Sequence, residues 1–557
     1  MAGLIALIPT DLHQGRLGHR RSLADPLAGR SVLEHTVRRA CSIETLKAVV
    51  LVHPADQDPL ALLPGKLPKP VYGFADEHNL CDPQTARLVS ARKWALDAWR
   101  GGLGFMTGFD ELLPPGPLLR AAQQHQAESV LLIRADWPLF DTDYARELIE
   151  MHRVSPEQMK LTMTQAPPGL GPLVLARSVL ADMTEHKGNF GQVLGYNPAA
   201  PAIDPIGREI TLPIPAEVRD SKHRYIYDTP RAIQRLKQIA ERLGDQLHTA
   251  SAQRITETQR SIDEDHSESA PDLLPQQINL ELTPRRTATG PIIPQAHVDF
   301  TRPDLDTDLA RRIIDQLADQ EGPADISLLL GGLGDPLFHP DWQAIVQHAH
   351  DTGVFGVGIE TDLLAEQQDL EALLDLPIDL VIVRMNADTA ETYETVMGQP
   401  FKTVVNNIQF LINERNRRRS LDGRGDATPW IVPRLIKTPD TLRDMESFFE
   451  RWVRATGYAM IQPACSGCGL MPEQSPVSME PPKRSACRQL GERMSILSDG
   501  TVALCDQDWL GRDPLGDVKI DTLQNIWQRV AERQEKHRAG RYHELTLCGS
   551  CKEWHRP

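Results

Sequence analysis

Short apolar runs alternate with amphipathic helical segments over residues 1–244. The runs are rich in branched apolar residues, which is typical of strands buried on both faces of a sheet. After the third run, Asp141 and Asp143 can cap a helix in which Tyr144 and Leu148 share a face. We therefore predict an α/β domain with a mostly parallel, Rossmann-like sheet. The three runs are Leu4–Ile8, Ala48–Val52 and Val130–Ile133.

A second α/β series begins at residue 278. Its helical faces have apolar residues one turn apart, as at Leu309, Ile313 and Leu317. Alternating strands and helices of this kind predict a partial (β/α)6 barrel with its site at the C-terminal strand ends. The six expected strands are Ile278–Leu282, Ile326–Leu330, Val354–Ile359, Leu380–Val383, Trp430–Val432 and Ala459–Ile461.

The stretch between the two series is polar. Ser251–Ala270 consists largely of Ser, Thr, Gln, Glu and Asp, a composition that favours a flexible linker. We therefore expect a domain over 1–244, a linker over 245–277, a barrel over 278–462 and a small loop-rich domain over 463–557.

The composition narrows the function classes. The 557 residues include 60 Lys and Arg against 76 Asp and Glu, and the net charge of −16 disfavours general nucleic-acid binding. No apolar run approaches the about 20 residues of a membrane-spanning helix, and the first residues lack a basic leader. We expect a cytoplasmic protein with no membrane partner, whose reduced thiols favour metal sites over disulfides.

The eight cysteines are unevenly distributed, and none lies between residues 82 and 464. Ser498-Asp499-Gly500 predicts a hairpin turn that brings Cys487 and Cys505 together. Cys548 and Cys551 form a second close pair, and four thiolates suit either a tetrahedral zinc ion or a 4Fe–4S cluster. The spacing alone leaves this choice open.

A further pair, Cys465 and Cys468, stands apart from these four. It can be an additional ligand pair, a redox couple or two ordinary loop thiols. Two thiolates do not complete a metal site, so the motif by itself decides nothing.

The tail resembles the SPASM region of radical SAM proteins. The resemblance rests on Cys487 and Cys505 with Gly500 between them, on Leu515-Gly516-Asp517-Val518, and on the final Cys548-x-x-Cys551. It implies a 4Fe–4S cluster rather than zinc. The longest members of the family carry seven cysteines and two clusters, whereas these four cysteines suffice for one.

Residues 277–462 resemble the radical SAM barrel. Gly331, Gly332, Gly334 and Asp335 look like the family's Gly-Gly-Glu region, which implies contact with the amino group of S-adenosylmethionine (SAM). Asp335 is one methylene shorter than the usual Glu.

The family's C-x3-C-x2-C loop has no counterpart in this barrel. Aligned from Glu281-Leu282-Thr283, its cysteine positions fall on Arg286, Gly290 and Ile293. A permanently cationic guanidinium cannot ligate iron, and the other two residues offer no donor. We therefore expect a core without radical chemistry, unless cysteines elsewhere in this chain or in a partner chain supply the ligands.

Residues 1–240 resemble nucleotidyltransferases. Ala135-Asp136-Trp137-Pro138 and Tyr227-Asp228-Thr229-Pro230 look like the two acidic elements of that family, which implies magnesium at Asp136 and Asp228. The phosphate-binding loop of the family ends in a lysine, whereas residues 10–21 contain none.

Together these features favour an iron–sulfur protein with one C-terminal cluster and a non-radical core that binds SAM or a protein or small-molecule partner. The alternatives are a divergent nucleotidyltransferase that uses Asp136 and Asp228, or a radical enzyme with ligands from elsewhere.

Overall fold

Two compact units, Met1–Ser267 and Glu268–Pro557, make up the computed structural model. Among the described residues, no helix is both long enough and apolar enough to cross a membrane. The described residues are 3–18, 20–76, 89–94, 114–186, 209–221, 223–266, 273–318, 325–422, 428–477, 479–487 and 489–555.

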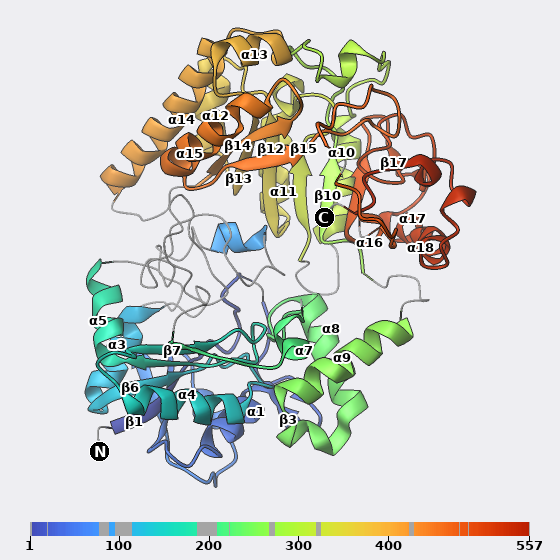
Figure 1. The fold of residues 1–557 in the computed structure, drawn as a ribbon. Helices are drawn as coiled ribbons and strands as arrows, with labels where there is room; N and C mark the ends of the chain where they lie inside the picture. Colours follow the sequence, from blue (N-terminus) through green and yellow to red (C-terminus); the bar gives the residue numbers. More distant parts are fainter. Residues whose placement is uncertain are drawn as a thin grey trace. The chain divides into compact units, whose positions relative to one another are not determined.

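The first unit is built on a seven-stranded sheet (Figure 1). Strands β5, β4, β1 and β6 lie side by side and are parallel to one another, while β8 runs antiparallel to its neighbours β6 and β7. The predicted α/β domain with a mostly parallel sheet is therefore confirmed. In order across the sheet, the strands are β5 (Val71–Asp76), β4 (Val49–Pro54), β1 (Gly3–Pro9), β6 (Ala127–Leu132), β8 (Leu173–Ala176), β7 (Leu161–Thr164) and β9 (Thr211–Leu212).

Helix α4 (Thr142–Val154) begins where the sequence predicts. The Asp141 side chain caps it by accepting from the backbone N–H groups of Asp143 and Tyr144. The other α-helices among the described residues of this unit are α1 (Val32–Cys41), α3 (Pro115–Gln124), α5 (Arg177–His186), α7 (Ala216–Arg219), α8 (Pro230–Leu243) and α9 (Ala252–His266).

The expectation of a flexible linker over 245–277 is wrong for its first two thirds. Residues 244–249 form a 3-10 helix, and helix α9 follows with Ile255 and Ile262 in the hydrophobic core of the first unit. Few apolar residues suffice here because Ala252, Ile255 and Ile262 recur near the helical repeat and lie on one buried face.

The second unit contains the predicted barrel. Strands β10 to β15 pair in chain order, each parallel to the next, which gives an open sheet of six parallel strands with helices in the five connections between them (Figure 1). The strands are β10 (Gln277–Leu280), β11 (Ser327–Leu330), β12 (Gly356–Thr361), β13 (Leu380–Arg384), β14 (Trp430–Lys437) and β15 (Met460–Pro463). The helices that alternate with them are α10 (Thr307–Ala318), α11 (Trp342–Asp351), α12 (Gln367–Asp375), α13 (Ala390–Met397), α14 (Phe401–Asp422) and α15 (Met445–Thr456).

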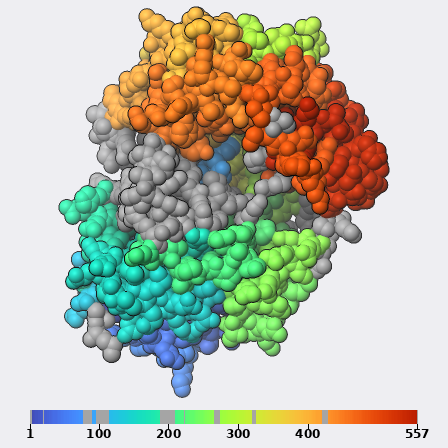
Figure 2. Space-filling model, in the orientation of Figure 1, coloured from blue at the N-terminus to red at the C-terminus, as the bar shows by residue number. Residues whose placement is uncertain are grey.

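The tail continues the barrel sheet. Strand β16 (Arg493–Ile496) pairs parallel to β10 and forms the predicted antiparallel hairpin with β17 (Thr501–Ala503), to which β18 (Gly516–Asp517) adds. The short helices α16 (Gln489–Glu492), α17 (Leu523–Gln528) and α18 (Val530–Arg538) complete the tail. Figure 2 shows the tail, in red, against the orange part of the same unit.

Candidate functional site

Five cysteines of the tail line one small cavity of about 20 Å³. Cys487 lies just before α16 and Cys505 just after the β16–β17 hairpin, so the hairpin brings them to the same place, as predicted. Cys548 and Cys551 border the cavity from the last 3-10 turn. The fifth thiol is Cys468, whose role the sequence leaves open. The structure therefore gathers all four predicted cysteines and adds one.

The surroundings of these thiols disfavour negative charge in the protein alone. The hydrogen bond with Cys505 contributes most to raising the pKa of Cys468 to about 12, and burial raises the pKa of Cys548 to about 12. Within the described residues, no group of three or more His, Cys, Asp or Glu side chains stands ready to hold a single ion. Metal ligation needs thiolates, so a cation bound here would have to supply the charge that deprotonates these thiols. The donor set fits zinc or an iron–sulfur cluster.

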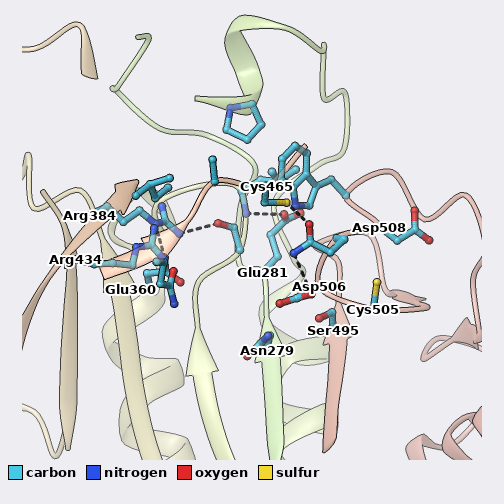
Figure 3. A pocket seen from close by; sticks show the side chains of 18 of the residues that line it. Asn279, Glu281, Glu360, Arg384, Arg434, Cys465, Ser495, Cys505, Asp506 and Asp508 are labelled. Atoms are coloured by element: carbon cyan, nitrogen blue, oxygen red, sulfur yellow. Dashed lines mark hydrogen bonds and ion pairs between the residues drawn. The ribbon is translucent and has the colours of Figure 1, made fainter. Parts of the chain in front are cut away.

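A second, larger cavity of about 430 Å³ opens at the C-terminal ends of the barrel strands (Figure 3). Cys505 lines both cavities, so the thiol site borders the barrel mouth. Cys465 lines only the larger of these two cavities, where its thiol hydrogen-bonds to Gln507. The charged residues around the larger cavity are Glu281, Arg286, Glu360, Arg384, Arg434, Arg493, Asp506 and Asp508.

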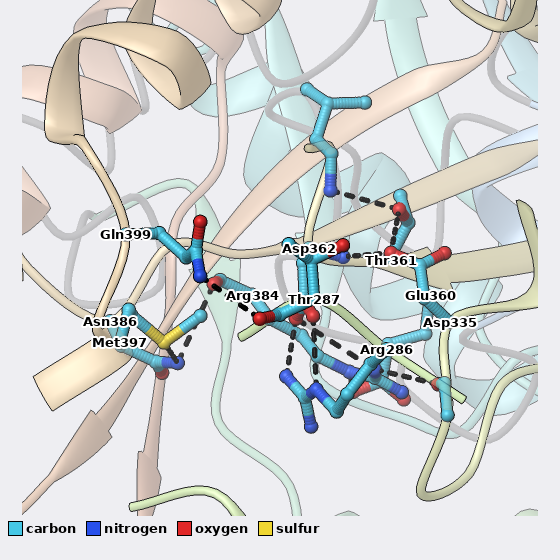
Figure 4. A network of polar contacts seen from close by, with 12 residues as sticks. Arg286, Thr287, Asp335, Glu360, Thr361, Asp362, Arg384, Asn386, Met397 and Gln399 are labelled. Carbon is cyan, nitrogen blue, oxygen red and sulfur yellow. Dashed lines mark hydrogen bonds and ion pairs between the residues drawn. The ribbon is translucent and has the colours of Figure 1, made fainter. Parts of the chain in front are cut away.

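In the loop after β10, the three positions aligned with the family's cysteines are engaged in contacts within the barrel. Arg286, at the first cysteine position, forms a two-pronged ion pair with the buried Asp362, with Nε 2.9 Å from Oδ2 (Figure 4). At Gly290 a Cβ would lie 2.0 Å from the carbonyl oxygen of Val396. Ile293, at the third position, is 2% exposed. One position is thus ion-paired, the second accepts no side chain, and the third is a buried residue at the edge of the larger cavity.

Two further arginines fill the barrel mouth. Arg384 donates from Nε to Glu360 at 2.9 Å and from its two other nitrogens to the carbonyls of Gly332 and Gly334 at 2.7 and 2.8 Å. Arg434 pairs with the same carboxylate. Burial opposes ionisation of Glu360, but the guanidinium groups of Arg434 and Arg384 hold its pKa at about 2. The glycine-rich turn is therefore fixed to β13 by charged hydrogen bonds, a network that the sequence did not reveal.

Asp335 does not offer a free carboxylate to the cavity. It is 2% exposed, and its oxygens accept from the N–H groups of Leu337 and Asp362 and from the Thr361 hydroxyl, at 2.8–3.1 Å. Burial, with the nearby Asp362 carboxylate, raises the pKa of Asp335 to about 6. The expected contact with the SAM amino group through Asp335 thus competes with three internal hydrogen bonds.

The three glycines of this turn allow close backbone approach. Gly332 has a φ of 102° and lines the cavity. At Gly334 a Cβ would lie 1.9 Å from the carbonyl oxygen of Thr283, and at Gly331 one would lie 3.0 Å from Glu360. Their small size serves the packing of the turn itself.

The two predicted acids of the first unit lie together. The Tyr227 N–H donates to the Asp136 carbonyl at 2.8 Å, which places Asp228 beside it, and both carboxylates are 1% exposed. Arg224 donates to Asp228 at 2.5 Å.

Arginines also neutralise Asp136. Arg134 donates to its two oxygens at 2.9 and 2.6 Å, and Arg21 lies 3.4 Å from one of them. Burial disfavours the charged form, but these guanidinium groups hold the pKa of Asp136 below its usual value. Magnesium needs carboxylate and water oxygens at about 2.1 Å, so arginine-filled surroundings do not fit it.

Of the other thiols, Cys41 is buried in α1 and Cys81 lies outside the described residues.

The second unit is thus an open sheet of six parallel barrel strands whose tail gathers five thiols beside the barrel mouth. Residues 487–552 match the family model described as SPASM, an iron-sulfur cluster-binding domain. The predicted resemblance is thereby confirmed for the tail, and this segment is a SPASM domain.

Three individual proteins can be compared with the chain. An uncharacterized protein of Treponema pallidum (strain Nichols) is 25% identical over 253 residues, which are 44% of this chain and 68% of that protein. The structure of BtrN in complex with AdoMet and 2-DOIA is 13% identical, with a TM-score of 0.35, over 50% of this chain and 94% of BtrN. A cytidylyltransferase from Leptospira borgpetersenii serovar Hardjo-bovis is 13% identical, with a TM-score of 0.32, over 48% of this chain and 95% of that enzyme. Similarities this low carry no functional argument.

Proposed function

We propose that this chain is a radical-SAM-like SPASM protein that holds one 4Fe–4S cluster in its tail and has lost radical chemistry in its barrel. The observation that carries the proposal is the loop after β10. Its first cysteine position is Arg286, ion-paired to a buried carboxylate, and its second is Gly290, which accepts no side chain. A cluster with an open iron for SAM needs three thiolates at this loop, and the loop supplies none.

The tail, in contrast to the barrel loop, contains the cysteines that a cluster needs. Cys487, Cys505, Cys548 and Cys551 line one cavity within the SPASM segment, and four cysteines complete the ligand set of a 4Fe–4S cluster. When bound, such a cluster supplies one-electron transfer. Because Cys505 also borders the barrel mouth, electrons would pass to or from a molecule held in the larger cavity.

The barrel mouth serves as a binding cavity in this proposal. Glu360 pairs with Arg384 and Arg434 within its lining, Arg493 lies 3.8 Å from Asp506, and Glu281 and Arg286 pair with Arg302 and Asp362. Because most of its charges are already paired, a ligand that carries both charges suits the cavity better than a bare anion. The nucleotidyltransferase alternative is disfavoured, because Arg21, Arg134 and Arg224 neutralise the acids that would bind magnesium.

Anaerobic iron and sulfide analysis tests the proposal. We expect about four irons and four sulfides per chain, lost in Cys505→Ser and retained in Cys41→Ser, a buried thiol of the other unit. Reduced protein should not convert SAM to 5′-deoxyadenosine. About eight irons, iron retained without Cys505, or SAM cleavage would each overturn the proposal.

A further inference from the structure

One wall of the thiol cavity carries an imidazole. His537, on helix α18, is 2% exposed and lines the cavity together with Arg484 and the five thiols. Its ring meets the Tyr542 ring edge to face, with 5.1 Å between the ring centroids, and this packing restricts the plane of the imidazole. The imidazole is therefore held in place beside the thiols.

A contact with Cys487 determines which ring nitrogen carries the proton. The backbone N–H of Cys487 donates to Nδ1 of His537 at 3.3 Å. A ring nitrogen that accepts a hydrogen bond has no proton of its own, so the imidazole is neutral and carries its proton on Nε2. Nε2 is thus a hydrogen-bond donor, and while it keeps that proton it cannot ligate a metal.

This donor lacks an acceptor in the part of the chain that the structure describes. The Nε2 atom is buried and makes no hydrogen bond. A buried N–H group without a partner is costly, so such a group normally faces a ligand, an ion or a water molecule. The two ring nitrogens flank the same carbon atom, so Nε2 lies on the half of the ring that is nearer to the Cys487 backbone. The unpartnered donor therefore belongs to the wall of the thiol site.

Arg484 gives this wall a second donor of the same kind. Its Nε is also buried without a hydrogen bond among the described residues, while another guanidinium nitrogen donates to the Cys548 carbonyl at 2.6 Å. The guanidinium carbon lies 4.1 Å from the centre of the Tyr542 ring, so both donors pack on one aromatic side chain. A cation and two N–H groups that lack acceptors suit an anionic group, and the thiols on the same cavity make that group rich in sulfur.

We propose that the Nε2–H group of His537 donates a hydrogen bond to a sulfur atom of the tail cluster and raises the reduction potential of that cluster. This inference rests on the proposed 4Fe–4S cluster. Such a cluster gains one negative charge when a reductant such as dithionite delivers one electron, and a hydrogen bond to sulfur stabilises the reduced form more than the oxidised form. His537 keeps its proton, and no bond of the cluster forms or breaks. His537 is therefore a positioning residue that acts through sulfur.

Redox titration followed by electron paramagnetic resonance (EPR) tests the inference in variants of the full chain. His537→Phe removes both ring nitrogens, whereas His537→Asn keeps an acceptor for the Cys487 N–H and has no donor at the Nε2 position. Both should retain about four irons, and their reduction should be about tenfold less favourable, which is a potential about 59 mV lower for a one-electron couple. His537→Gln places an amide N–H near the Nε2 position and should recover most of this difference.

His543→Phe is the matched control. His543 is exposed on the same tail and does not line the thiol cavity, so this variant should have the wild-type potential. Where phenylalanine at position 537 disturbs the fold, as far-UV circular dichroism of the apo-protein would show, His537→Asn carries the comparison. Pulsed EPR adds a direct readout, a weakly coupled proton that disappears after reconstitution in heavy water and is absent from His537→Asn.

Three results would overturn the inference. Equal potentials in wild type and His537→Asn would mean that buried water, not the cluster, accepts from Nε2. Loss of iron from His537→Phe and His537→Asn alike, or a strong coupling between the cluster and a histidine nitrogen, would make His537 a ligand instead. A wild-type protein without iron refutes the proposed function and this inference with it, whereas equal potentials in iron-loaded protein refute the inference alone.

Discussion

Arg286→Met removes the cation that stands where the radical SAM loop has its first cysteine. It pairs with Asp362, and the two side chains are 5% and 1% exposed, so both charges are buried. Removing one partner of a buried ion pair costs about 3–5 kcal/mol because the other charge stays buried. Arg384 remains 3.9 Å from Asp362 and offsets part of this cost. We therefore expect a loss of about 3 kcal/mol in the free energy of unfolding.

Urea unfolding of the purified apo-protein measures this loss. The double variant R286M/D362N removes both charges and should unfold within about 1 kcal/mol of wild type, because replacing a whole buried pair is often nearly neutral. Arg285→Met is the matched control. Its ion pair with Asp304 is 55% and 31% exposed, so its loss should cost less than about 1 kcal/mol. A cost below about 1 kcal/mol for R286M, or no recovery in the double variant, would refute the claim that this pair stabilises the barrel mouth.

Three further predictions concern other sites. Asp136→Ala removes the carboxylate that neutralises two buried arginines and should cost about 3 kcal/mol in thermal unfolding, with no magnesium-dependent shift in wild type. The raised pKa of Asp335, about 6, means that its stabilising effect is fully present at low pH and lost as pH rises through 6. Wild type should therefore gain urea resistance relative to Asp335→Asn when the pH falls from about 8 to about 5, and parallel profiles would contradict this. Gly290→Ala should cost about 2 kcal/mol through overpacking against Val396, whereas Gly65→Ala, with no atom within 4 Å of the added Cβ, should be neutral.

The apolar runs predicted the sheets well, because strands buried on both faces need uninterrupted branched residues. The run at Trp430–Val432 is extended in the structure to β14, which ends at Lys437. The apolar run ends before Arg434, a charged residue that is buried in the strand because it pairs with Glu360. Hydropathy does not reveal such a contact. Helix α9 was not predicted because its sequence is mostly polar. Two isoleucines are nevertheless enough to bury one face of the helix.

The candidate site could be predicted only where chain order brings residues together. The hairpin placed Cys487 beside Cys505 because Asp499 and Gly500 define its turn. The position of Cys468 depends on a left-handed backbone and on contacts with residues about 40 positions away, which spacing cannot reveal. The direction of the Asp335 carboxylate depends likewise on hydrogen bonds from the Thr361 hydroxyl and the Asp362 N–H, at the end of strand β12.

EPR of the dithionite-reduced protein, recorded before and after SAM is added, tests the central claim most directly. A cluster with four cysteine ligands has no open iron, so we expect one 4Fe–4S signal, about one spin per chain, unchanged by SAM. A signal that shifts on addition of SAM, or a second cluster that persists in Cys505→Ser, would place an open-iron cluster in the barrel and contradict the account.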